Sequence, residues 1–224
     1  MKKYILIIAI SSMVAIFLTA KFVLIGKSNE NPKLEPIIAK HPAILNPEVS
    51  GRRVVKRIEL LEPKPAFNFE LTDMDRTLFQ LEDYRGKLVL IGFIYTTCPD
   101  VCGILTMHFR RIQREFADIL DKDLVLVFIT TDPKRDTPER VAAYTKGFDG
   151  RWHFLTGTES QLREVWDQYR VFVKPKPEVE LVYHSYMVVL LDRQGLIRYR
   201  YIGLVDPEEV IVKDIHYLLT KGGM

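Results

Sequence analysis

Three short stretches of the chain are apolar almost without interruption. They are residues 88–95 (LVLIGFIY), 124–130 (LVLVFIT) and 186–192 (YMVVLLD). A strand with one solvated face alternates apolar and polar residues, so continuous apolarity predicts strands that are covered on both faces. The pattern therefore predicts a central sheet with helices packed against it.

Helical spacing appears between and after these runs. From the first run to the second, apolar residues recur at steps of four, three and four and form one stripe: Leu105, Phe109, Ile112 and Phe116. Such a stripe predicts an amphipathic helix. A second helix is predicted at 136–144, where Thr137 suits the N-cap and Pro138 the first helical position. Two more are predicted at 158–169 and 206–219.

Hairpin patterns complete the expected domain. Residues 67–87 alternate apolar and polar positions around a turn at 73–76, which predicts an N-terminal β-hairpin extension. The third apolar run turns through DRQG and pairs with 196–203. Residues 171–185 are too extended for a helix and too long for an ordinary loop, so we expect an excursion that delivers His184 to the third strand. This order predicts a thioredoxin-like α/β domain, a central mixed sheet flanked by helices.

The N-terminus carries a candidate membrane anchor. Residues 4–20 hold no charge, and the apolar run continues to Gly26 with only Lys21 interrupting it, about one bilayer thickness. A cleaved signal peptide is the competing interpretation, but the run is longer than the usual ~7 to 15 apolar residues. Leu18 is also too large for the small-residue cleavage site that would end at Ala20. We expect a single uncleaved transmembrane helix.

The flanking residues give the anchor an orientation. Lys2 and Lys3 favour a cytoplasmic N-terminus, which places the rest of the chain on the extracytoplasmic, periplasmic side of the cell membrane. No cysteine follows the run, so lipoprotein processing is not expected. The sequence thus divides into an anchor at 1–27, a tether rich in Pro, Asn, Lys and Glu at 28–65, and a domain at 66–221.

The charge and cysteine content argue against two classes of protein. The net charge of +3 comes from well-mixed charged residues without a basic block, so a nucleic-acid partner is not expected. The chain has two cysteines, Cys98 and Cys102, in TTCPDVCGILT. Two cysteines do not make the disulfide framework of a core-poor secreted domain, so their spacing needs a local explanation.

The two cysteines lie where a buried strand meets a helix. If Pro99 takes the first helical position, Cys98 and Cys102 are one turn apart on one face, with Cβ atoms about 5 to 6 Å apart. An unstrained disulfide needs about 3.5 to 4.5 Å. This geometry suits two thiolates on one soft ion at least as well as a disulfide, although a modest shift of the turn would allow the bond. A helix N-terminus would also lower the thiol pKa values.

Three interpretations of the pair remain from the residues alone. The cysteines could be small core residues, a stabilising disulfide or a functional dithiol, and the Pro-Asp between them favours the dithiol. The other histidines, His41, His108, His153 and His216, are not assigned to a metal.

Three motifs together resemble the Sco/SenC family of membrane-anchored, thioredoxin-like copper chaperones, which assist assembly of the binuclear copper centre of cytochrome c oxidase. They are GFIYTTCPDVCGILT, TTDPKRDTPERVAAY and YHSYMVVLLDRQG, in family order and spacing, and the similarity covers residues 67–219. The resemblance implies that Cys98, Cys102 and His184 bind copper. It further implies a copper-centre oxidase subunit as partner, with a copper donor protein and a thiol reductant.

Two positions depart from the family pattern. Gly103 stands where a proline often follows the second cysteine, and Tyr183 where an aspartate often precedes the histidine. Neither change removes a ligand, but Tyr183 leaves no carboxylate beside His184 to tune the site. The implied donor set is soft, favours Cu(I) and can hold Cu(II) with an additional weak ligand, whereas zinc normally needs a fourth donor.

A thiol-disulfide oxidoreductase is the main alternative. The same anchor, fold and dithiol, Cys98 and Cys102, would serve a dedicated reductase of the oxidase's copper-site cysteines. General thioredoxin-like reductants use C-x-x-C and a cis-proline before the third strand, whereas this chain has no proline between Pro177 and Pro207. The sequence therefore favours a metallochaperone over an enzyme.

Overall fold

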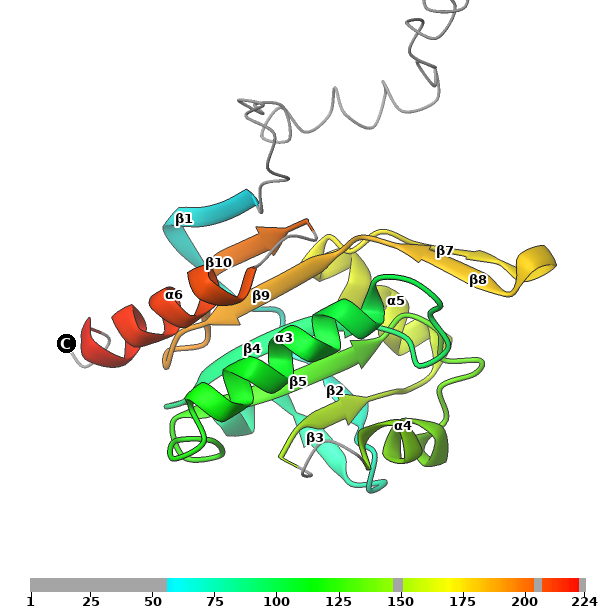
Figure 1. Ribbon diagram of the computed structural model, residues 1–224, viewed down its shortest axis with the longest axis horizontal. Coiled ribbons are helices and arrows are strands. Elements are labelled where there is room, and N and C mark those ends of the chain that lie inside the picture. The colour runs from blue at the N-terminus through cyan, green and yellow to red at the C-terminus, as the bar shows by residue number, and fades with distance from the viewer. Residues whose placement is uncertain (1–55, 147–150, 204–206, 222–224) are drawn as a thin grey trace, which may run out of the picture. The chain divides into compact units, whose positions relative to one another are not determined.

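The computed structural model describes residues 56–146, 151–203 and 207–221 (Figure 1). The predicted anchor at 1–27 and most of the predicted tether lie outside the described residues. No helix in the described ranges is long and apolar enough to cross a membrane.

Six strands of the described chain form the central sheet, in the order β1-β10-β9-β4-β5-β6. Strand β4 runs parallel to β5 and antiparallel to β9, β5 is parallel to β6, and β10 is antiparallel to both β9 and β1, so the sheet is mixed. The bounds are β1 Lys56–Pro65, β4 Leu88–Ile94, β5 Leu124–Thr130, β6 His153–Leu155, β9 Met187–Leu191 and β10 Leu196–Ile202.

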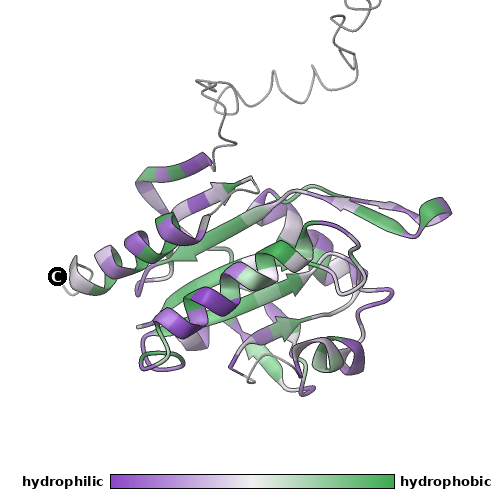
Figure 2. Ribbon diagram, viewed as in Figure 1, coloured by the Kyte–Doolittle hydropathy of each residue, from purple (hydrophilic) through white to green (hydrophobic). Residues whose placement is uncertain are grey.

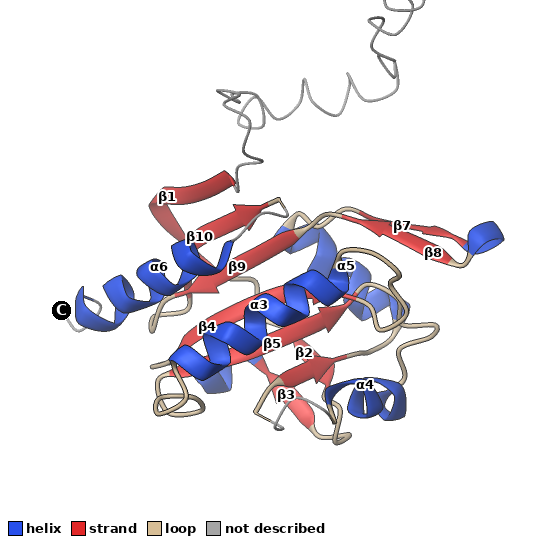
Figure 3. Cartoon of the chain, in the orientation of Figure 1, coloured by secondary structure: helices blue, strands red, loops and turns tan. Residues whose placement is uncertain are grey.

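Helices and two hairpins surround this sheet (Figure 3). The helices are α3 Cys102–Glu115, α4 Pro138–Thr145, α5 Glu159–Tyr169 and α6 Pro207–Lys221, with short 3-10 helices at Leu81–Tyr84 and Pro177–Val179. One antiparallel hairpin joins β2 Glu70–Thr72 to β3 Leu78–Gln80, and the other joins β7 Val173–Lys176 to β8 Leu181–His184. The second hairpin extends beyond the sheet in Figure 1.

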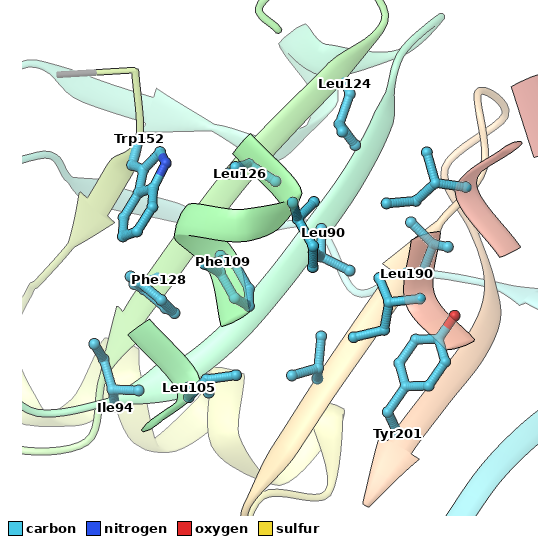
Figure 4. Packing of buried hydrophobic residues seen from close by; sticks show 14 of the residues in the cluster. Leu90, Ile94, Leu105, Phe109, Leu124, Leu126, Phe128, Trp152, Leu190 and Tyr201 are labelled. Atoms are coloured by element: carbon cyan, nitrogen blue, oxygen red, sulfur yellow. The ribbon is translucent and has the colours of Figure 1, made fainter. Parts of the chain in front are cut away.

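Successive residues of β4, β5 and β9 point to opposite faces, and both faces are buried, so these strands are hydrophobic along their length (Figure 2). On one face, Leu90 packs with α3 through residues such as Phe109 (Figure 4). The same cluster includes Ile215 of α6. On the other face, Ile91 packs with α5 and with the β2–β3 hairpin. The continuous apolar runs in the sequence are the direct consequence.

Gly92 lets α3 lie close to the sheet. A Cβ at this position would lie 2.8 Å from Phe128 Cε1 and 3.0 Å from Phe109 Cζ, both closer than normal carbon contacts. The phenyl rings of Phe109 and Phe128 pack with centroids 4.3 Å apart over the space that the glycine leaves. This packing fixes α3, and with it the cysteine-bearing turn that precedes the helix.

The predicted mixed sheet with flanking helices is confirmed. The three apolar runs form β4, β5 and β9, all four predicted helices are present, and Thr137 caps α4 with Pro138 in its first turn. The β2–β3 hairpin and the β9–β10 pairing are also as expected. The short strand β6 was not predicted, because three residues carry too little pattern to identify.

The sheet begins earlier than the predicted domain boundary. Residues 56–65, assigned to the tether, form β1 and pair with β10. Arg57 on this strand forms a two-point ion pair with Asp214 of α6, at 2.7 and 2.8 Å. The strand is largely exposed and its apolar residues are few, which is why its sequence resembles a linker.

Candidate metal and thiol site

The two cysteines lie in the turn between β4 and α3. Both are free thiols, Cys98 half-buried and Cys102 only 2% exposed. The Cys98 amide donates to the Tyr95 carbonyl at 3.3 Å and closes the turn at the strand end. The first helical bond runs from Leu105 N to Val101 O.

The condition that Pro99 takes the first helical position is therefore not met. The helix begins at Cys102, with Val101 as its N-cap, so Cys98 precedes the helix and does not share a face with Cys102. Residues 96–97 form a turn between the end of β4 and the first cysteine. The sulfur of Cys98 is nevertheless hydrogen-bonded to Cys102.

His184 reaches the cysteines from the base of the β7–β8 hairpin, where β8 ends. It is the last residue of β8, as expected for an excursion that returns to the third strand. At the base of the hairpin, Ser185 N donates to Phe172 O at 2.9 Å, and Phe172 N donates to Ser185 Oγ at 3.0 Å. These two bonds fix the segment next to the imidazole.

The imidazole faces the sulfurs through Nε2. Its Nε2 atom lies 3.5 Å from Cys102 Sγ, and the ring is also hydrogen-bonded to Cys98. The other nitrogen, Nδ1, lies 3.0 Å from the Ser185 carbonyl oxygen. A carbonyl can only accept, so Nδ1 carries a proton, and Nε2 is the ring nitrogen that faces the thiols.

The two thiols differ in electrostatics. The hydrogen bond that Cys98 accepts from Cys102 is the largest cause that lowers the pKa of Cys98, and its hydrogen bond with His184 lowers this pKa further. The same bond, in which Cys102 is the donor, raises the pKa of Cys102, and burial raises it further. The pair thus holds one shared proton, and Cys98, the less buried of the two, is the nucleophilic sulfur.

Asp136 connects the cysteine turn to the sheet. It is fully buried, and its carboxylate accepts from Thr96 N at 3.1 Å, Thr96 Oγ1 at 2.5 Å and Thr130 Oγ1 at 2.6 Å. Its backbone carbonyl accepts from Thr156 Oγ1 at 2.6 Å. The aspartate therefore connects the ends of β4, β5 and β6 through hydrogen bonds. Its contact at the end of β4 is Thr96, two residues before Cys98.

No group of three or more His, Cys, Asp or Glu side chains within the described ranges surrounds a common point as metal ligands would. Cys98, Cys102 and His184 are adjacent, but they hydrogen-bond to one another. His108 is buried against Glu208 of α6 at 3.4 Å, His153 pairs with Asp73, and His216 lies beside Glu115. These three histidines have partners away from the cysteines.

One residue of the site was missed by the sequence analysis. Tyr95, directly after β4, is 3% exposed, and its hydroxyl is hydrogen-bonded to Cys98. Its ring meets the His184 ring edge to face, with centroids 5.7 Å apart. The only signal in the sequence is a polar tip at the end of an otherwise apolar run.

Fold and site together define a thioredoxin-like domain with a dithiol and a histidine beside one end of its central strands. The SCO1/SenC family model matches residues 61–220, and the chain belongs to this family.

Relatives and solved structures agree with this assignment. The SCO2-like protein RP587 of Rickettsia prowazekii is 36% identical over 135 residues, 57% of this chain and 64% of the relative, so the match spans less than two thirds of that protein. The structure of Bradyrhizobium japonicum ScoI with copper bound is 30% identical, with a TM-score of 0.61, and covers 69% of this chain and 99% of that one.

A more distant structure shares the fold alone. It is that of BsSco, 23% identical, with a TM-score of 0.57, covering 77% of this chain and 99% of that one. BsSco is described as a member of the Sco family of cytochrome c oxidase assembly proteins, in which a disulfide switch was identified.

Proposed function

We propose that the chain is a copper-binding assembly factor for the binuclear copper centre of cytochrome c oxidase, with Cys98, Cys102 and His184 as its copper ligands. The observation that carries the proposal is the approach of His184 Nε2 to the cysteine sulfurs, with Nδ1 bonded to a carbonyl. The copper-bound structure of a 30% identical relative supports it.

The donor set fits copper. Two sulfurs and one imidazole nitrogen are soft to borderline ligands, which favour Cu(I) and accept Cu(II) when a weak further ligand is added. The Ser185 carbonyl keeps the imidazole in the tautomer that a ligand needs, as partners of metal-binding histidines do. Because the sulfurs and the ring already hydrogen-bond to one another, small displacements are enough for them to share an ion.

The three proposed ligands differ in their exposure to solvent, so a partner can approach the site from one side only. Cys98 and His184 are partly exposed, whereas Cys102 is buried. An ion held by the three residues is thus open to a partner from the side of Cys98 and His184. In this proposal the protein delivers copper and does not keep it as a cofactor. Release to an oxidase subunit requires that ligands of that subunit compete for the ion from the side of Cys98 and His184.

A dedicated thiol-disulfide reductase of the oxidase's copper-site cysteines is the second candidate, favoured by the unequal cysteines. The Cys98 thiolate would attack the partner disulfide, forming a mixed disulfide and releasing one partner thiolate. Cys102, after losing its proton, would then attack the sulfur of Cys98. The partner leaves with two reduced cysteines, and this chain keeps the disulfide and has given up two electrons.

One experiment separates the two functions. Copper stoichiometry of the purified protein is measured first, followed by transfer of copper to an oxidase copper-centre domain with reduced cysteines. Reduction of the same domain's disulfide by the copper-free protein is measured beside it. We expect one copper per chain and transfer to the reduced domain. Reduction of the domain without stoichiometric copper binding would assign the reductase function instead.

We further propose the topology that the sequence predicts, with an anchor at 1–27, a tether after it and the copper-binding domain on the extracytoplasmic side. We expect the mature protein to retain its first residues and to fractionate with membranes. Mass spectrometry of the mature N-terminus is the test, and a start at Lys21 would contradict the anchor.

A further inference from the structure

Tyr95 joins the cysteine turn to the hairpin that carries His184. The residue lies one position beyond β4 and is almost fully buried, so its hydroxyl must find partners inside the domain. Val182 N, in β8, donates to this hydroxyl at 3.4 Å. The backbone amide can only donate, which leaves the phenolic hydrogen for Cys98, the other partner of the hydroxyl.

The backbone of the hairpin is bonded to the domain at Val182. Across the hairpin, Val182 pairs with Pro175. The Val182 amide donates to the Tyr95 hydroxyl, so a backbone group of the hairpin is held by a side chain of the domain. The hydroxyl therefore bridges the hairpin backbone and a cysteine sulfur.

The ring of Tyr95 makes two further contacts. Its edge-to-face packing with His184 limits the orientation of the imidazole. The Arg135 guanidinium lies over the Tyr95 ring, 5.6 Å from its centroid, and its Nη1 donates to Glu180 O at 2.6 Å. Arg135 is itself paired with Asp132 in the loop after β5.

We propose that Tyr95 is a positioning residue that holds the His184 hairpin against the cysteines and, through its hydroxyl, stabilises the reduced form of Cys98. Its importance for copper rests on the proposed function, but the positioning of the hairpin and the effect on the thiols do not. The sulfur of a reduced cysteine is a better hydrogen-bond acceptor than a disulfide sulfur. The hydroxyl therefore favours the dithiol over the disulfide.

The test uses Tyr95→Phe in the metal-free protein, since phenylalanine keeps the ring and removes only the hydroxyl. The reduced protein is equilibrated with glutathione and glutathione disulfide. Oxidation closes the Cys98–Cys102 bond and converts one glutathione disulfide to two glutathione molecules. We expect the equilibrium constant to move about tenfold toward the protein disulfide, which corresponds to a potential about 30 mV more negative.

Amide hydrogen exchange gives an independent measurement. In reduced Tyr95→Phe, the Val182 amide loses its acceptor, so its exchange should accelerate about tenfold or more, while the amide of Leu126 in β5 should keep its protection. Tyr169→Phe is the matched control: Tyr169 is buried, its hydroxyl donates to Phe67 O at 3.0 Å, and it packs on the other face of the sheet. It should change neither the glutathione equilibrium nor Val182 exchange by more than about twofold.

Arg135→Gln separates the two roles. It removes the contact with Glu180 but leaves the Tyr95 hydroxyl, so hairpin exchange should rise without a shift in the glutathione equilibrium. An unchanged Val182 amide and an unchanged equilibrium in Tyr95→Phe would overturn the proposal. An equal shift of the equilibrium in Arg135→Gln would also overturn it. A failure to bind copper would overturn the proposed function and leave these metal-free results to decide the role of Tyr95.

Discussion

His184→Ala should abolish high-affinity Cu(II) binding and leave the dithiol chemistry intact. Loss of the imidazole leaves two thiolates, a set that holds Cu(I) in linear coordination but binds Cu(II) poorly. Substitution of groups that only support a metal ligand typically costs about 10- to 100-fold in affinity. We therefore expect Cu(II) affinity to fall about 100-fold or more, with a smaller loss for Cu(I). Competition titrations with chelators of known affinity measure both.

Dithiol-disulfide exchange in the same variant provides the contrast. It requires only Cys98 and Cys102, so the variant should still cycle with glutathione. His216→Ala is the matched control, because this histidine is exposed on α6 and lies beside Glu115, away from the cysteines. A His184→Ala strain should fail to assemble the oxidase copper centre while His216→Ala assembles it. Full assembly in His184→Ala at ordinary copper supply would remove the chaperone hypothesis in favour of the dedicated reductase.

The sequence predicts the layers of this fold because burial leaves a strong pattern in it. Strand β5 is buried along its whole length, and α3 packs through one stripe, so continuous apolar runs and a helical period alternate along the chain. Strand β1 leaves no such pattern, since it lies at the sheet edge and is held largely by backbone pairing and by the Arg57–Asp214 ion pair. Its identity depends on contacts with residues more than a hundred positions away.

The candidate site is predictable in its residues and not in its geometry. The cysteine spacing and the extended segment before His184 are visible in the sequence, and the family resemblance selects that histidine. The start of α3 at Cys102 is not visible, because it depends on the Tyr95 carbonyl closing the turn at Cys98. The role of Tyr95 depends on a hairpin that returns some ninety positions later and presents the Val182 amide to it.

Asp136→Ala should have the largest effect on stability among the polar residues near the site. The substitution leaves Thr130 Oγ1, which is fully buried, and Thr96 N, which is partly buried, without their acceptor. Each buried group without a partner costs about 1 to 3 kcal/mol, so we expect the free energy of unfolding to fall by about 3 to 5 kcal/mol. Urea denaturation measures this. Asp136→Asn keeps an acceptor oxygen and should lose about 1 kcal/mol.

The control for Asp136 is another buried aspartate at a distance from the cysteines. Asp192 accepts from Gln194 N at 3.0 Å and from Leu196 N at 2.9 Å in the β9–β10 turn. Asp192→Ala should also destabilise the domain. Only Asp136→Ala should alter copper affinity and the glutathione equilibrium under conditions where both variants are folded, because only Asp136 holds the backbone at Thr96. Equal effects of both variants on the thiols would show that Asp136 acts through general stability alone.

Asp136 also makes a specific contribution to the pH dependence of stability. Burial raises the pKa of Asp136 above its ordinary value of 3.8. Between the unfolded and the folded pKa, the folded protein holds a proton that the unfolded chain has released. The stabilising contribution of this group is therefore complete below the unfolded pKa and declines as the pH rises through the folded pKa. Asp136→Asn has no proton to lose, so the stability of the wild type relative to Asp136→Asn should decrease as the pH is raised across this window. A constant difference, or one that increases with pH, would mean that hydrogen bonds from the threonines outweigh burial at this carboxylate.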